Sequence, residues 1–108
     1  IDAKIKFSDI TTSLAESLNK LKPYGEGNPK PLFFAEKIFK KSPPKKIRSY
    51  SSIWLSDGAR TLEAIVYDKD LLEIINYADK FDIVFMPQVN YYLNIPKLLI
   101  KDCRLSEV

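Results

Sequence analysis

Glycine and proline gather in one short segment, which divides the chain into two parts with different hydrophobic patterns. Residues 21–31 hold two of the three glycines and three of the seven prolines in the 108-residue sequence. Glycine allows positive φ, while proline fixes φ, lacks an N–H donor and pushes the residue before it out of the helical region. Neither a helix nor a strand can run unbroken through such a segment. We therefore predict a joint of defined shape between a helical part and a β-rich part.

The part before the joint has the pattern of a short strand followed by a helix. Residues 1–7 alternate apolar and polar side chains, which is typical of a half-buried strand. Ser8 or Asp9 is a suitable N-cap for a helix. The apolar residues that follow predict one stripe on a helix of about three turns, formed by Ile10, Leu14, Leu18 and Leu21.

The part after the joint predicts a mainly β structure. The apolar patterns indicate a helix at 68–77 and five strands at 32–40, 47–55, 61–67, 81–90 and 96–105. Pro43 and Pro44 exclude a central strand over 41–46, which we predict to be a loop, and Asp57-Gly58 indicates a hairpin turn. Five strands with a helix between the third and the fourth are the outline of an OB fold, a five-stranded Greek-key barrel. SH3-like and other small β-barrels differ from this outline only in connectivity.

The composition excludes several kinds of active site. Histidine is absent from the sequence, so no Ser-His-Asp, Cys-His or histidine–metal arrangement can form. The single cysteine, Cys103, allows neither an internal disulfide nor a cysteine metal cluster, and it fits a reducing cytoplasm. The acidic residues are scattered singly, unlike those of a carboxylate metal loop. We therefore expect no catalytic residue, metal or cofactor in this chain, and apolar runs such as 83–86 are far too short to cross a membrane.

Positive charge is concentrated in one stretch of the chain. The net charge is +3, but six lysine and arginine residues lie within positions 37–48, and the remainder of the chain is at −3. A local basic stretch favours binding of a polyanion more than an evenly basic surface would. The alternative is a solvated loop whose lysines only maintain solubility.

The joint also resembles the signature of a known family. Residues 21–31, followed by Phe33, resemble the LxPFGxGNPxPxF motif of RecJ-type single-stranded-DNA exonucleases, with Tyr24 in place of the usual phenylalanine. In that family the motif lies where the DHHA1 domain leads into the C-terminal OB domain.

The strands after the joint resemble the same family, with two departures. Residues 62–67, 81–85 and 98–104 are similar to family strands, the last to "lqlxIkDir". Tyr50-Ser51-Ser52 stands where relatives often have Gly-x-x-His-Leu, and Asn94 or Ile95 stands where glycine is expected. If those positions contact DNA in relatives, this chain contacts DNA differently.

The resemblance implies a domain arrangement and a function. Residues 1–22 would be the tail of a DHHA1-type domain with its connecting helix, and residues 23–108 the OB domain of a longer protein. That protein would be a 5′-to-3′ single-strand exonuclease of DNA repair and recombination, with Mg²⁺ or Mn²⁺ held in its DHH domain. The joint residues would set the angle between the barrel and the catalytic core; they are Pro23, Tyr24, Gly25, Gly27, Asn28, Pro29 and Pro31.

We predict that single-stranded DNA binds on a basic surface with aromatic side chains. Tyr50 and Trp54 share one side of the second barrel strand with Arg48, and form the expected stacking surface. The alternative is that Trp54 packs under the N-terminal helix or against the missing domain. The other predicted contacts lie on the barrel rim or the fifth strand, and they are Lys45, Lys46, Tyr91, Tyr92, Lys97 and Lys101.

An interaction module is the alternative function. The barrel would then dock on the catalytic domains, or its basic stretch would receive an acidic peptide from a partner such as single-strand-binding protein. If the chain is an interaction module, a charge reversal at Lys45, Lys46 and Arg48 should abolish peptide binding but leave DNA binding intact.

Overall fold

The computed structural model describes residues 3–19 and 32–106. The predicted joint at 21–31, with Pro23, Tyr24, Gly25, Gly27, Asn28, Pro29 and Pro31, lies outside the described residues, so its shape stays a prediction. The described elements, in chain order, are β1 (Ala3–Lys4), a 3₁₀ helix (Phe7–Asp9), α1 (Thr12–Asn19), β2 (Phe33–Lys40), β3 (Lys45–Ile47), β4 (Tyr50–Ser56), β5 (Thr61–Val66), α2 (Lys69–Tyr77), β6 (Phe81–Asn90) and β7 (Ile95–Leu105). No helix among these residues is long and apolar enough to span a membrane.

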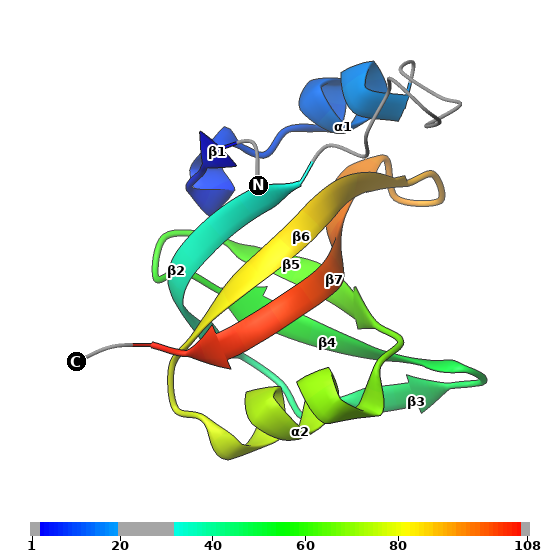
Figure 1. Cartoon of the computed structure of the whole chain (residues 1–108). Coiled ribbons are helices and arrows are strands. Elements are labelled where there is room, and N and C mark those ends of the chain that lie inside the picture. The colour runs from blue at the N-terminus through cyan, green and yellow to red at the C-terminus, as the bar shows by residue number, and fades with distance from the viewer. Residues whose placement is uncertain (1–2, 20–31, 107–108) are drawn as a thin grey trace, which may run out of the picture.

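Five of the strands pair in a ring (Figure 1). β2 pairs with β6, β6 with β7 and β5 with β4 in antiparallel fashion, while β7 pairs with β5 in parallel. The pairing of β4 with β2 returns to the first strand through two residue pairs, Phe39 with Ser56 and Lys40 with Leu55. With α2 between the third and fourth barrel strands and α1 before the first, this is the predicted OB fold.

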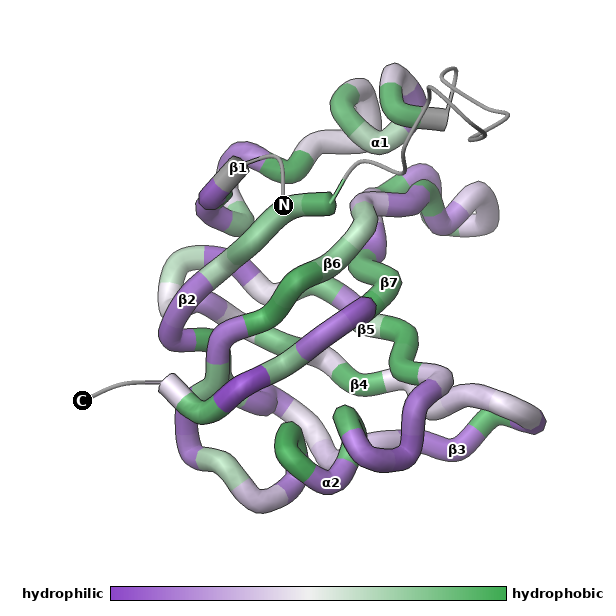
Figure 2. Tube along the Cα trace, viewed as in Figure 1, coloured by the Kyte–Doolittle hydropathy of each residue, from purple (hydrophilic) through white to green (hydrophobic). Residues whose placement is uncertain are grey.

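The interior of the barrel is filled by aromatic and branched aliphatic side chains. Alternate residues of the barrel strands point inward, as the period of two predicts. The short outer strand β3 consists mostly of hydrophilic residues, as Figure 2 shows. The core continues into the N-terminal segment, because Phe7 and Ile10 are fully buried with the barrel residues. The ring of Phe7 meets that of Phe85 edge to face at 6.4 Å.

The N-terminal helix begins later than the sequence predicted. Neither Ser8 nor Asp9 is its N-cap: Asp9 lies in the 3₁₀ helix, and the hydroxyl of Thr11 accepts a hydrogen bond from Leu14 N at 3.0 Å. The reason is tertiary. Asp57 of the β4–β5 turn accepts a hydrogen bond from Phe7 N at 3.0 Å, and this fixes the chain in a tight turn before the helix can start. The predicted strand over 1–7 is also shorter: among the described residues 3–7, the strand pairing with β2 is limited to Ala3 and Lys4.

The predicted strand over 47–55 is interrupted, and the predicted loop over 41–46 is too long. Lys45 and Lys46 lie in β3, which folds back on β4 as a hairpin. Arg48 lies in the turn of this hairpin with φ of 53°, so it is not part of the strand that carries Tyr50. Pro43 and Pro44 lack N–H donors and stay in the loop, whereas the residues after them have N–H groups and can pair with β4.

A buried carboxylate on β6 links β2 to the end of β7. Asp82 on β6 is only 3% exposed, and its Oδ1 accepts hydrogen bonds from Lys37 N at 3.1 Å and from Ser106 Oγ at 2.7 Å. Its Oδ2 accepts from Arg104 Nε at 3.0 Å. Lys37 has φ of 56°, at the point where the register of β2 against β6 shifts. Asp82 therefore holds this irregular part of β2 in place.

Candidate nucleic-acid interface

The outer face of β4 and β5 carries aromatic and polar side chains, of which Trp54 is exposed, Tyr50 and Glu63 are half-buried and Ser52 is buried. Inward-pointing residues of these strands, such as Ile53 and Ala64, belong to the core. The alternate residues point outward, which places Tyr50 and Trp54 on the same face as the sequence predicted. In an OB fold this is the face that binds oligonucleotides, between the loops that follow strands one and four.

Trp54 is exposed and its backbone is held from one side. The residue is 38% exposed. The backbone N–H of Trp54 donates to Ser42 Oγ at 3.3 Å, and the backbone carbonyl oxygen of Trp54 accepts from Lys41 N at 2.8 Å. These two hydrogen bonds tie β4 to the loop before β3. α1 packs against β6 and β7 instead of covering this ring. These contacts of α1 and the exposure of Trp54 argue against packing under the N-terminal helix, whereas packing of Trp54 against the missing domain stays an alternative.

A second aromatic group extends this face. The rings of Tyr50 and Tyr67 lie 5.5 Å apart at an angle of 53°, and Tyr67 is 58% exposed. Tyr67 was not among the predicted contacts. The signal for it was present, because Tyr67 continues the outward alternation of Glu63 and Ile65 along β5.

Four strands bring a row of different polar and aromatic groups together. The registers pair Trp54 with Glu63, Glu63 with Lys97, and Lys97 with Gln88. Residues paired in this way point to the same face of a sheet, at a strand spacing of about 4.8 Å. The predicted contact Lys97 therefore lies in one transverse row with Trp54. Glu63 and Gln88 were not predicted, since only the pairing of distant strands reveals them.

The basic stretch predicted from the sequence is divided between different surfaces. Lys45 pairs with Ser52 and shares the face of Trp54, whereas Lys46 pairs with Ser51 and points to the other side of the hairpin. Arg48 is exposed in the hairpin turn. Lys40 Nζ donates to the carbonyl oxygen of Asn76 at the end of α2, at 2.8 Å.

The turn between β6 and β7 forms the second rim. Tyr91 and Tyr92 are exposed there, and Asn90 Oδ1 accepts hydrogen bonds from the backbone N–H groups of Tyr92 and Leu93 at 3.0 and 3.2 Å. This turn and the β3–β4 hairpin both extend toward the right of the view in Figure 1.

Lys101 lies away from the row that contains Lys97. It falls at a register shift of β7, between Ile100, which pairs with Phe85, and Asp102, which pairs with Val84. Four residues along a strand correspond to about 13 Å. The structure therefore does not bring Lys101 together with the other predicted contacts.

Comparison with known protein families agrees with this architecture. The family model described as the RecJ OB domain matches residues 1–102. The chain therefore belongs to the RecJ OB domain family. No curated protein matches the chain in sequence.

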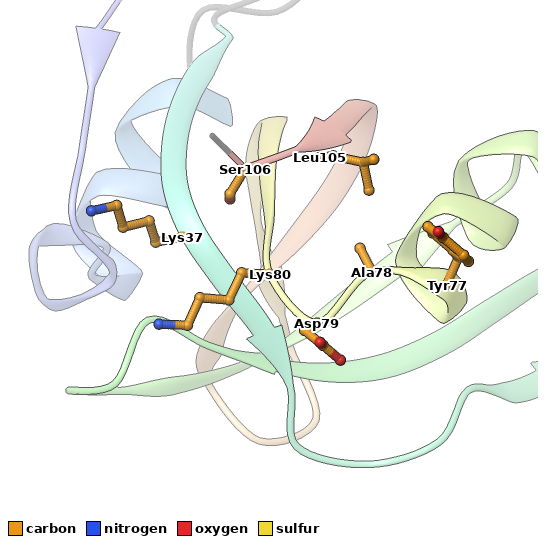
Figure 3. A pocket seen from close by; sticks show the side chains of 7 residues that line it. All are labelled: Lys37, Tyr77, Ala78, Asp79, Lys80, Leu105 and Ser106. Carbon is orange, nitrogen blue, oxygen red and sulfur yellow. The ribbon is translucent and has the colours of Figure 1, made fainter. Parts of the chain in front are cut away.

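A hollow of this RecJ OB domain lies at another part of the surface. It has a volume of about 670 Å³ and lies between the end of α2 and the end of β7 (Figure 3). Tyr77 and Leu105 are exposed beside it, but the side chains of Lys37 and Lys80 extend away from both. The hollow therefore lacks the converging polar groups that mark a small-molecule site.

The cysteine of the RecJ OB domain, Cys103, is buried in β7. Burial, reinforced by the charges of Asp102 and Asp82, raises the pKa of the Cys103 thiol to about 12. A thiol in this state is not a nucleophile at neutral pH. Among residues 3–19 and 32–106, no group of three or more acidic or cysteine side chains could hold a metal ion.

Proposed function

We propose that this RecJ OB domain binds single-stranded DNA on the outer face of β4 and β5. The observation that carries the proposal is the exposure of Trp54 on the same face as the Tyr50–Tyr67 pair, four residues or about 13 Å along β4, where OB folds bind oligonucleotides. Bases stack on aromatic faces regardless of sequence, with about 1–3 kcal/mol for each base. Lys45 and Arg48 line the hairpin edge of this face, where they can contact phosphates.

The proposal extends to the protein of which this domain would be part. That protein would be a 5′-to-3′ single-strand exonuclease acting in DNA repair and recombination in the cytoplasm. Its chemistry and its Mg²⁺ or Mn²⁺ would belong to DHH and DHHA1 domains, and the barrel would hold the strand for them. Docking on those domains, or on single-strand-binding protein, is the alternative role of the same basic residues.

A fluorescence titration tests the binding proposal directly, because Trp54 is the single tryptophan of the chain. Addition of a single-stranded oligonucleotide at low salt should quench the emission, and added salt should reverse the quenching. Replacement of the ring in Trp54→Ala should weaken binding by about 1–3 kcal/mol, as measured by polarisation of a labelled strand.

Tyr77→Ala provides the matched control. Tyr77 is 82% exposed, but it lies on α2 and outside the proposed face. Its replacement should leave DNA affinity unchanged. An oligonucleotide that neither quenches Trp54 nor binds at low salt would exclude the proposal for this chain.

A further inference from the structure

The proposed DNA-binding face carries a carboxylate near its centre. Glu63 lies directly opposite Trp54 on the neighbouring strand, and Lys97 follows on the strand beyond it. Cβ atoms of residues paired across antiparallel strands are about 4.5–5.5 Å apart. A carboxylate at this position repels phosphate groups, so its presence on a surface for DNA requires another role.

The carboxylate is oriented and retains a free oxygen. Glu63 is half-buried, and its Oε2 accepts a hydrogen bond from Ser52 Oγ at 2.7 Å. Ser52 is itself buried, so the donor is fixed. Among the described residues, Oε1 of Glu63 accepts no hydrogen bond, and Glu63 forms no ion pair with Lys97. One acceptor oxygen, on the residue paired with Trp54 across the strands, therefore remains available to a ligand.

The charges around Trp54 also indicate how a strand would lie. Lys45 and Arg48 are on the hairpin side of β4, and Glu63 is on the opposite side of it. Phosphates are attracted to the hairpin side, whereas Glu63 repels them at the position next to Trp54, and the positive charge of Lys97 lies one strand further away. The backbone would follow the hairpin edge, and the bases would point across Trp54 toward Glu63.

We propose that Glu63 makes this face selective for bases with an exocyclic amino group. The inference rests on the proposed function. A cytosine stacked on Trp54 can donate its N4 amino hydrogen to the free carboxylate oxygen, whereas thymine presents its O4 carbonyl at the same position. Two oxygen acceptors facing each other are repulsive, so the carboxylate both favours cytosine and disfavours thymine.

Two oligonucleotides of equal length and charge test this inference. Oligo(dC) and oligo(dT) of about 15 nucleotides, within the range that one OB fold covers, differ at the edge that Glu63 would meet. Binding is measured at low salt and mildly alkaline pH through Trp54 emission and through polarisation of a labelled strand. We expect oligo(dC) to bind about tenfold more tightly than oligo(dT).

Glu63→Gln is the decisive variant, because glutamine keeps an acceptor for Ser52 but can also donate to thymine O4. The tenfold ratio should fall to about twofold or less. Glu73→Gln removes the same charge from an exposed position on α2 and should leave the ratio unchanged.

The outcomes separate the two proposals. Equal binding of both oligonucleotides by the unaltered chain would overturn the base selectivity while leaving DNA binding intact. A preference that persists in Glu63→Gln would also overturn it. Failure of the chain to bind either oligonucleotide would overturn both proposals.

Discussion

Asp57 and Phe7 are fifty positions apart in the sequence, yet the Asp57 carboxylate accepts a hydrogen bond from Phe7 N at 3.0 Å. The same turn contributes Arg60, whose Nη1 donates to the carbonyl oxygens of Phe7 and Ile10. Burial alone would raise the pKa of Asp57, but hydrogen bonds from the backbone N–H groups of Ala59, Arg60 and Phe7 outweigh it and lower that pKa. The β4–β5 turn is therefore more than the hairpin turn that Asp57-Gly58 predicts, since it fastens the N-terminal segment to the barrel.

Replacement of this carboxylate should destabilise the domain. Asp57→Ala leaves three backbone donors without their charged acceptor, which we expect to lower the free energy of unfolding by about 1.5–3 kcal/mol in urea titrations. Asp79→Ala is the control, because Asp79 is an exposed residue beyond the end of α2. Equal stability of the two variants would show that the Phe7 contact contributes nothing.

Acid should weaken the domain partly through Asp82. Burial would raise the pKa of this carboxyl, but hydrogen bonds from Ser106, Lys37 and Arg104 lower it below its ordinary value of 3.8. The folded state then binds this proton less readily than the unfolded state. The stabilisation is fully present above pH 3.8 and is lost as pH falls through the lower pKa of the folded state.

The measurement is the free energy of unfolding as a function of pH, from about pH 5 to about pH 2. Asp82→Asn should be less stable at neutral pH and should lose less stability on acidification. Asp79→Asn should follow the unaltered protein. An Asp82→Asn curve parallel to that of the unaltered protein would contradict the assigned role.

Lysines at different distances from Trp54 should differ in their effect on the salt dependence of DNA binding. Lys45 shares the face of Trp54, so Lys45→Ala should reduce the slope of log K against log salt by about 0.7 for a single strand. Lys101 lies at the register shift of β7, so Lys101→Ala should leave the slope unchanged. The test is a titration of labelled oligonucleotide at several salt concentrations. A larger change of slope in Lys101→Ala than in Lys45→Ala would contradict a DNA path over β4 and β5.

Cys103 should resist thiol reagents in the folded domain. It is buried, and the pKa of its thiol is raised to about 12, so thiolate is scarce at neutral pH. Alkylation by iodoacetamide at pH about 7.5 should be slow, and it should become fast once urea unfolds the chain. The modified fraction can be followed by mass spectrometry. Rapid modification of the native domain would show that β7 opens at its end.

The sequence predicted the order of the elements well because each strand carries its own local pattern. The apolar patterns of β5, α2 and β6 are local signals, and the structure places these elements within one residue of the predicted bounds. The errors have non-local causes. The N-cap was misplaced because Asp57 holds Phe7, and the strand that contains Arg48 was misjudged because positive φ there depends on the hairpin pairing.

The candidate site was predicted in part for the same reason. Alternation along one strand was enough to place Tyr50 and Trp54 on one face, and an exposed loop was enough to place Tyr91 and Tyr92 on a rim. The sequence could not reveal that Lys45 and Lys46 point to opposite sides of a hairpin, since that requires the register of β3 against β4.

The sequence by itself determined the order of the elements and the resemblance to a family, because strand periodicity, turn residues and the motif at 21–31 are all properties of neighbouring residues. The connectivity that distinguishes an OB fold from other small β-barrels came from the strand pairing. Only the tertiary structure decided which side chains share a surface. The row of Trp54, Glu63, Lys97 and Gln88 comes from four strands, and hydrogen bonding between backbones sets its register. Such a row cannot be derived from any one segment, because a shift of a single residue in one strand would turn its side chain to the other face.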